Sequence, residues 1–138
     1  MFSAGAFFCG MGGFCAGFES NGFRTIWAND FDRNVKNTYQ YNFPHAEFIS
    51  GPIEDIKSER LTSVHVVHGG FPCQSFSAAG VRSGFNDPKG RGKLFDVMMD
   101  KIEEIKELPL VLVFENVPNL KIGASGTWFE HIKRRIKA

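Results

Sequence analysis

Five short apolar runs predict the strands of a single sheet. Each is rich in branched or aromatic residues and is bounded by turn-forming residues, which is typical of buried strands. Between the runs lie longer segments with helical spacing of apolar positions, and this alternation predicts an α/β fold with a mostly parallel sheet. The predicted strands are Ser3–Phe8, Thr25–Ala28, Glu47–Ser50, Val64–Val67 and Leu110–Phe114.

The helical segments are expected at residues 13–20, 31–42, 94–108 and 127–137. Asn21-Gly22 ends the first, with Gly22 suited to a left-handed cap, and Pro44 follows the second. Pro109 ends the third. The last is amphipathic and basic at its end, and we expect its apolar residues Trp128, Phe129 and Ile132 to pack on the core.

Composition limits the classes of protein. The chain has 138 residues, of which 43% are hydrophobic, enough for one domain with a proper core. The net charge of +1 means that any nucleic-acid contact must come from a local basic patch. Cys9, Cys15 and Cys73 show no metal or disulfide spacing, which fits a reducing cytosol. Neither a membrane span nor a signal peptide is expected.

A glycine turn after the fourth run presents a single cysteine. Gly69-Gly70-Phe71-Pro72-Cys73 follows the predicted strand, so Cys73 reaches the carboxyl edge of the sheet, where ligands bind in open α/β folds. Pro72 fixes the backbone just before the thiol. Cys73 is therefore a candidate nucleophile; the alternative is a small buried apolar residue.

A second glycine-rich turn, Cys9 to Phe14, connects the first strand to the first helix. This arrangement lets backbone amides approach a nucleotide-like ligand closely. A nicotinamide fingerprint would need a further glycine where Cys15 stands, so that class is disfavoured. Asp30 follows Gly12 at nearly the spacing of an acid that accepts from ribose hydroxyls. Alternatively, Asp30 or Asp32 caps the next helix.

Two further segments carry candidate chemistry. Glu115 follows the last apolar run, and a carboxylate at the end of a buried strand must be hydrogen-bonded or used; capping is the alternative. Residues 78–92 form a long polar, glycine-rich segment with Arg82, Lys89 and Arg91, whose charges could meet phosphates. An ordinary solvated loop is the other interpretation.

Ordered motifs resemble those of DNA (cytosine-5) methyltransferases. Gly70-Phe71-Pro72-Cys73-Gln74, followed by Ser75-Phe76-Ser77, resembles the catalytic motif. Phe8-x-Gly10-x-Gly12-Gly13 resembles the S-adenosylmethionine motif, and Glu115-Asn116-Val117 matches another. Gly84–Pro88 and Arg91–Phe95 resemble the far end of the mobile catalytic loop, with Lys93 as a mild departure.

The resemblance implies a Rossmann-like methyltransferase fold and a mechanism. Cys73 would attack carbon 6 of a flipped cytosine, and Glu115 would hydrogen-bond or protonate ring nitrogen 3. The implied S-adenosylmethionine contacts are Phe8, Gly10, Met11, Gly12, Gly13, Asp30, Phe31, Ile53, Pro72, Leu94 and Asn116. The implied DNA contacts are Gln74, Ser75, Ser77, Arg82, Lys89 and Arg91.

One motif departs from the family. Where the usual pattern is Gly-Asp-Ile, with the aspartate receiving the adenine amino group, this chain has Gly51-Pro52-Ile53. Glu54, Asp55 or a backbone carbonyl could take over that role. The departure concerns cofactor affinity rather than reaction type.

The resemblance also implies the strand order three-two-one-four-five and then two further strands, for which no residues remain. We therefore expect residues 1–138 to be a partial catalytic domain without a target-recognition region, open at the fifth strand. A fragment or one half of a split enzyme would fit, acting on double-stranded DNA in a bacterial cytosol or nucleoid, in restriction-modification or genome methylation. The alternatives are an RNA (tRNA) cytosine-5 methyltransferase and a non-catalytic subunit.

Overall fold

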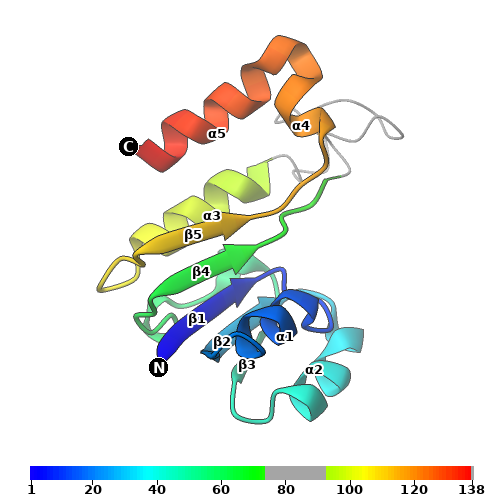
Figure 1. Cartoon of the computed structure of the whole chain (residues 1–138), viewed down its shortest axis with the longest axis vertical. Helices are drawn as coiled ribbons and strands as arrows, with labels where there is room; N and C mark the ends of the chain where they lie inside the picture. The colour runs from blue at the N-terminus through cyan, green and yellow to red at the C-terminus, as the bar shows by residue number, and fades with distance from the viewer. Residues whose placement is uncertain (74–92, 138) are drawn as a thin grey trace.

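A five-stranded parallel sheet organises the structure. The computed structural model describes residues 1–73 and 93–137. The strands are β1 (Phe2–Phe7), β2 (Phe23–Asp30), β3 (Glu47–Ser50), β4 (Val66–Gly69) and β5 (Val111–Phe114). Their order is β3-β2-β1-β4-β5, and every neighbouring pair is parallel (Figure 1). The α/β fold and the strand order are confirmed.

Helices and single turns connect the strands. The helices are α1 (Gly13–Glu19), α2 (Lys36–Asn42), α3 (Leu94–Glu103), α4 (Asn119–Ile122) and α5 (Thr127–Lys137). Short 3-10 turns are η1 (Arg33–Val35), η2 (Ile53–Asp55), η3 (Ser58–Arg60) and η6 (Gly123–Gly126). In Figure 1, α1 and α2 lie in front of β1–β3, whereas α3 lies behind β4 and β5. Within the described residues, no helix is long and apolar enough to cross a bilayer.

Alternation along the strands builds a core on each face of the sheet. Phe7 and Trp27 belong to a large cluster that includes Phe95 and Met98 of α3. The strand neighbours of these two residues point the other way, as period-two side chains must. Ala6, Ala28 and Phe48 pack with Cys15 of α1 and Tyr39 of α2 on that second face. The small alanines leave room for the helices that carry the cysteine and the tyrosine.

Several predicted boundaries are wrong. The helix expected at 94–108 ends at Glu103, because the chain turns inward to bury Ile105, whose amide donates to the Ile102 carbonyl (3.1 Å). The helix expected from residue 31 starts as η1 and becomes α-helical only at Lys36. The fourth strand runs from Val66 to Gly69, later than 64–67. Gly22 adopts the predicted left-handed conformation, with φ 83°.

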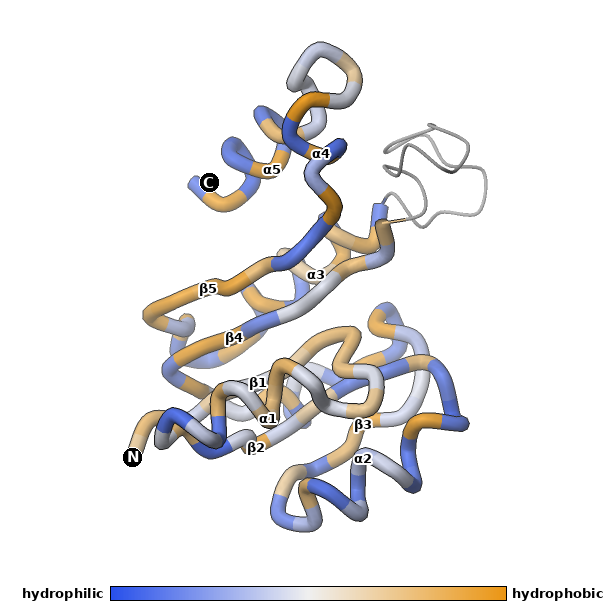
Figure 2. The backbone as a smooth tube through the Cα atoms, turned by 45° about the vertical axis from the view of Figure 1, so that its right-hand side comes forward, coloured by the Kyte–Doolittle hydropathy of each residue, from blue (hydrophilic) through white to orange (hydrophobic). Residues whose placement is uncertain are grey.

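The fifth strand is more exposed than its sequence predicts. An apolar run is typical of a strand covered on both faces, and Figure 2 shows β5 as strongly hydrophobic. Nevertheless, Val111 is 50% exposed, and the other three residues are only half-buried. The cause is its position, since in the described part of the chain β5 pairs with β4 alone.

The last helix, α5, packs against α3 through charged pairs and apolar contacts. The His131 Nε2 atom lies 2.8 Å from Asp96 Oδ1, and Arg135 pairs with Asp100 and Glu103. Ile132 is buried and Trp128 packs against the core, as predicted. Phe129 instead lines a groove of about 400 Å³ between α5 and β5, so its expected place in the core is wrong.

A matched pair of glycine substitutions tests the packing of β1. A Cβ atom on Gly5 would come within 2.2 Å of the buried Trp27 ring, whereas one on Gly17 would meet nothing within 4 Å. We expect Gly5→Ala to lower the free energy of unfolding by about 1–3 kcal/mol through overpacking. Gly17→Ala should raise it by about 0.5–1 kcal/mol, since alanine is the better helix residue. Urea denaturation measures both; equal effects would contradict the β1 packing.

Buried His68 predicts an acid-sensitive stability. The ring of Phe18 stacks on His68 at 4.7 Å, and burial lowers the pKa of His68 from 6.5 to about 4. As the pH falls, His68 therefore becomes protonated in the unfolded chain at a higher pH than in the folded protein. The contribution of His68 is complete above pH 6.5 and is lost as the pH falls to about 4, amounting to on the order of 3 kcal/mol.

His68→Gln should flatten this part of the pH profile, as measured by urea denaturation between pH 4 and pH 7. His65→Gln is the control. His65 is exposed and directly precedes β4, so this variant should keep the wild-type dependence of the free energy of unfolding on pH. An unchanged slope in His68→Gln would assign the acid sensitivity to another group.

Candidate functional site

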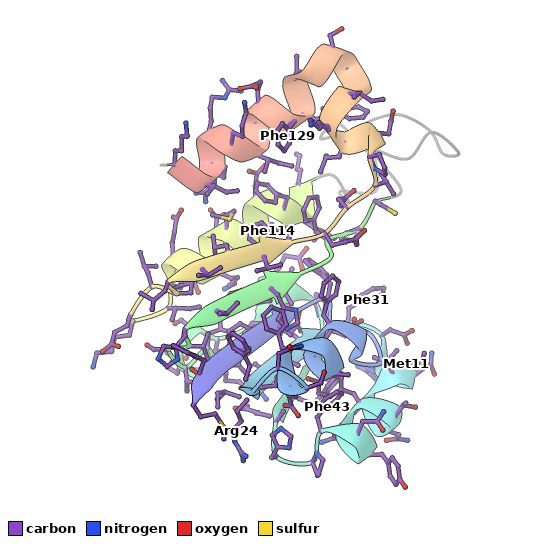
Figure 3. The ribbon with its side chains drawn as sticks, viewed as in Figure 1. Met11, Arg24, Phe31, Phe43, Phe114 and Phe129 are labelled. Atoms are coloured by element: carbon purple, nitrogen blue, oxygen red, sulfur yellow. The ribbon has the colours of Figure 1, made fainter. Side chains whose placement is uncertain are left out.

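A pocket of about 630 Å³ opens at the carboxyl ends of the strands. It combines aromatic and apolar walls with two carboxylates and one thiol. Its lining residues are Phe8, Phe31, Pro52, Ile53, Glu54, Gly70, Phe71, Pro72, Cys73, Leu94, Glu115 and Val117. In Figure 3 the ring of Phe31 projects at these strand ends; this side chain is 69% exposed.

Strand register brings three of the lining residues together. Phe7 of β1 is paired with Gly69 of β4, and Gly69 is paired with Phe114 of β5. Because the three strands end on one row, the residues that follow them, Phe8, Gly70 and Glu115, enter the pocket side by side.

Gly70 makes room for the Glu115 carboxylate. A Cβ atom at Gly70 would lie 3.3 Å from Glu115 Oε2, tighter than most real Cβ contacts. The Glu115 amide donates to the Gly69 carbonyl (3.2 Å), which holds the start of this segment against β4. A side chain at position 70 would therefore require the Glu115 carboxylate to shift by a few tenths of an ångström within the pocket that it shares with Cys73.

The segment that carries Cys73 is fastened from β5. Asn116 Nδ2 donates to the carbonyl of Phe71 (2.8 Å), and its Oδ1 accepts from the Val117 amide. The ring of Phe71 is buried against Phe95 at 5.1 Å. Asn116 thus holds the backbone two residues before the half-buried thiol rather than lining the pocket.

The other two cysteines are poor nucleophiles. Burial raises the pKa of the Cys9 thiol far above its usual value, and the Asp30 carboxylate raises it further. Burial also raises the pKa of Cys15, which accepts a hydrogen bond from the Tyr39 hydroxyl (3.1 Å). Since the thiolate is the reactive form, Cys73 is the candidate that faces the pocket.

Asp30 holds the glycine-rich turn. Its Oδ2 accepts from the Gly10 amide (2.8 Å) and its Oδ1 from the Asp32 amide (2.9 Å). Of the two acids considered as helix caps, Asp32 is the cap, since it accepts from the Asn34 amide. Each Asp30 oxygen retains a second lone pair, so binding of a ribose diol stays a prediction.

The turn needs unusual backbone conformations. Phe8, Gly10 and Gly12 have φ values of 53°, 53° and 97°. A Cβ atom at Gly12 would lie 2.2 Å from the Phe43 ring. This position therefore requires glycine both for its left-handed backbone and for the space that a side chain would need. Phe8 has no such freedom, and its left-handed backbone is a strained geometry that turns the chain at the pocket wall.

The pocket unites seven of the predicted site residues. They are the catalytic candidates Cys73 and Glu115 and the cofactor candidates Phe8, Phe31, Ile53, Pro72 and Leu94. The cofactor candidates that do not line it are Gly10, Met11, Gly12, Gly13, Asp30 and Asn116. The predicted DNA contacts Gln74, Ser75, Ser77, Arg82, Lys89 and Arg91, with the loop 78–92, lie outside the described residues.

Sequence reasoning left some lining residues unassigned. Val117 belongs to the same short motif as Glu115, which could have identified it. Glu54 was one of three alternatives, and only its place in the pocket selects it. In the described part of the chain no group of acidic, histidine or cysteine side chains could hold a metal ion.

A second hollow of about 650 Å³ lies on the outer side of α1. It is lined by Gly13, Phe14, Gly17, Phe18, Asn21 and Phe23, none of which is titratable or nucleophilic. The chemistry therefore belongs to the pocket at the strand ends.

Comparison with known proteins gives consistent matches. The family model for C-5 cytosine-specific DNA methylase matches residues 2–138. The chain is 40% identical over 139 aligned positions to the Type II methyltransferase M.Bsp6I of Bacillus sp., covering all of this chain and 43% of that protein. It is 33% identical to the Type II methyltransferase M.HhaI of Haemophilus parahaemolyticus, covering 91% of this chain and 37% of that protein. The chain thus spans less than half the length of these relatives.

Solved structures share the fold. A putative DNA modification methyltransferase encoded within an E. coli prophage superposes with a TM-score of 0.73 at 22% identity, covering 99% of this chain and 38% of that one. The Dnmt2 methyltransferase of S. pombe gives a TM-score of 0.70 at 14% identity, covering 96% of this chain and 40% of that one.

The two acids at the end of β2 provide a matched test of the turn. In Asp30→Asn one oxygen becomes an NH₂ group, which cannot accept from the Gly10 or Asp32 amide. We expect a loss of about 1–3 kcal/mol in the free energy of unfolding, the cost of an unsatisfied buried donor. Asp32→Asn should be nearly neutral, because asparagine caps a helix as well as aspartate does. Thermal or urea denaturation that ranked the two variants the other way would contradict the assigned roles.

Proposed function

This chain belongs to the C-5 cytosine-specific DNA methylase family, and we propose that it forms the part of such an enzyme that binds the cofactor and carries the nucleophile. The cofactor would be S-adenosylmethionine and the substrate a cytosine in double-stranded DNA. The observation that carries the proposal is the convergence of Cys73 and Glu115 in the pocket that Phe8 and Phe31 also line.

The pocket suits an adenosyl cofactor. Its volume of about 630 Å³ is within the usual range for small-molecule sites, and its walls are mostly apolar. Phe8 and Phe31 offer aromatic faces, and Asp30 at the end of β2 offers acceptor oxygens near the glycine turn. When bound, S-adenosylmethionine supplies an electrophilic methyl group.

Cys73 overcomes the low nucleophilicity of carbon 5. Its thiolate forms a bond to carbon 6 of cytosine, and the electrons of the 5,6 double bond make carbon 5 the nucleophile that takes the methyl group. The transfer would leave S-adenosylhomocysteine as the departing thioether. A base such as water would then take the proton from carbon 5, and the electrons of that C–H bond would restore the double bond. The bond between Cys73 and carbon 6 breaks, and its electron pair returns to sulfur.

Glu115 stabilises the ring during the addition. Negative charge builds on the pyrimidine as the thiolate adds, and a hydrogen bond or proton at ring nitrogen 3 reduces it. Because Gly70 has no side chain, the Glu115 carboxylate can lie beside the segment that carries Cys73. Since a duplex hides the target atom, the cytosine must be flipped out of the stack to reach this pocket.

A further segment should complete the sheet. The exposed Leu110 and Val111, at 78% and 50%, leave the outer edge of β5 open among the described residues, and such edges are normally covered. The groove between β5 and α5 is lined by Leu112, Phe114 and Phe129, so the added segment would meet apolar walls. It would come from the same polypeptide or from a second chain.

The biological setting follows from the substrate. Residues 1–138 would act as a partial catalytic domain, in restriction-modification or genome methylation in a bacterial cytosol or nucleoid. Target recognition would reside elsewhere. An RNA substrate is the alternative, and competition between duplex DNA and tRNA separates the two.

Replacement of the nucleophile tests the mechanism. Cys73→Ser should reduce methyl transfer to background while the chain stays folded, because a hydroxyl is a far poorer nucleophile at neutral pH. The assay follows labelled methyl transfer to DNA by the chain, alone and with the polypeptide encoded downstream added in trans. We expect little transfer by the chain alone.

A covalent trap identifies the attacking residue independently. In 5-fluorocytosine, carbon 5 carries fluorine in place of the proton, and fluorine cannot leave as a cation. With this base in the DNA, S-adenosylmethionine present and the downstream polypeptide added, the adduct should persist and map by mass spectrometry to Cys73. Cys9→Ser is the matched control and should still form it. An adduct on Cys9 or Cys15 would refute the assignment of Cys73. Robust sequence-specific methylation by the 138-residue chain alone would instead refute the proposal that it is a partial catalytic domain.

A further inference from the structure

The pocket has two halves, set by the strand order. Cys73 and Glu115 follow β4 and β5, whereas Phe31 follows β2 and the segment Pro52–Glu54 follows β3. Asp30 is paired with Ser50, and the Gly51 amide donates to the Asp30 carbonyl (3.0 Å). The segments that follow β2 and β3 therefore start side by side. Phe8 lies between the halves, at the end of central β1.

The β2–β3 half contains one charged group. Phe31, Pro52 and Ile53 are apolar there, and Pro52 has no amide hydrogen to donate. The carboxylate of Glu54 is the only ionisable group in this half among the described lining residues. No hydrogen bond or ion pair within the described part of the chain engages it.

The neighbouring polar groups point elsewhere. Asp55, in the same η2 turn, lines a different hollow with Lys57 and Arg60. The Pro52 carbonyl accepts from the Asp55 amide (3.1 Å). The acceptor that this half of the pocket presents to a ligand is thus Glu54.

We propose that Glu54 reads the exocyclic amino group of the cofactor's purine and so makes the pocket selective for adenine. This inference rests on the proposed function. A carboxylate can only accept hydrogen bonds, and the 6-amino group of adenine can donate one to it. A purine with a 6-oxo group presents an acceptor at the same place, and the two acceptors repel each other. Apolar walls supply no competing donor.

Calorimetry with two product analogues tests the selectivity. S-adenosylhomocysteine and its deaminated counterpart S-inosylhomocysteine differ at position 6, where the amino group becomes an oxo group, and at the adjacent ring nitrogen 1, which gains a hydrogen. We expect the 138-residue chain, titrated up to millimolar ligand, to bind the adenosyl compound about tenfold or more tightly, the scale of one charged hydrogen bond.

Glu54→Gln should reduce this preference to within about threefold, because the glutamine amide can turn its NH₂ group towards a 6-oxo group. Asp55→Asn, one residue further along the same turn, is the control and should keep the wild-type preference. Circular dichroism establishes that both variants are folded.

The outcomes separate the two levels of the proposal. If Glu54→Gln keeps the full wild-type preference, or if Asp55→Asn loses it, Glu54 does not read the purine, although the cofactor site stands. If the wild-type chain binds both analogues equally, the inference also fails. If it binds neither analogue, the proposed cofactor function fails, and the inference falls with it.

Discussion

Alignment of three strand ends is the constraint on which the site depends. Phe7, Gly69 and Phe114 occupy one row of the sheet, so the chain leaves β1, β4 and β5 at the same level. A shift of one residue in any of these pairings would turn every side chain of that strand to the opposite face. It would withdraw Phe8 or Glu115 from the pocket. The core packing that fixes register therefore also fixes the chemistry.

Backbone hydrogen bonds extend this alignment to the loops. The Asp30 carboxylate holds the Gly10 amide, and Asn116 holds the Phe71 carbonyl. Each side chain belongs to one strand end and fastens the loop of another, so neither loop can move without its neighbour. Asn116 acts on the thiol through two residues of backbone, one of which is Pro72 with its fixed φ. Rigid support of this kind suits the nucleophilic role proposed for Cys73, which requires the thiol to be held in one position relative to its target atom.

Much of this arrangement could be predicted from residue patterns. Apolar runs and glycine turns are local signals, and they located all five strands and pointed to Cys73 and Glu115 as candidates that the structure places in one pocket. The strand order was predicted from the family resemblance. The end of α3 could not be predicted, because Ile105 is buried by a turn that tertiary packing imposes on a helical pattern. The exposure of β5 depends on which strands lie beside it, and no local pattern contains that information. Selection of Glu54 over Asp55 likewise required the direction of two side chains in one short turn.

The two halves of the pocket differ in how well the described residues support them. The β2–β3 half follows strands that are covered by α1 and α2 on one face and by the large core cluster on the other, and the buried Asp30 ends β2 there. The half that carries Glu115 depends on β5, which has an open outer edge and a groove beneath α5. Local opening is easiest where few apolar contacts hold a strand. In the proposed function, recognition of the cofactor would depend on strands that are covered, whereas transfer of the methyl group would depend on β5, which among the described residues has a neighbouring strand on one side only.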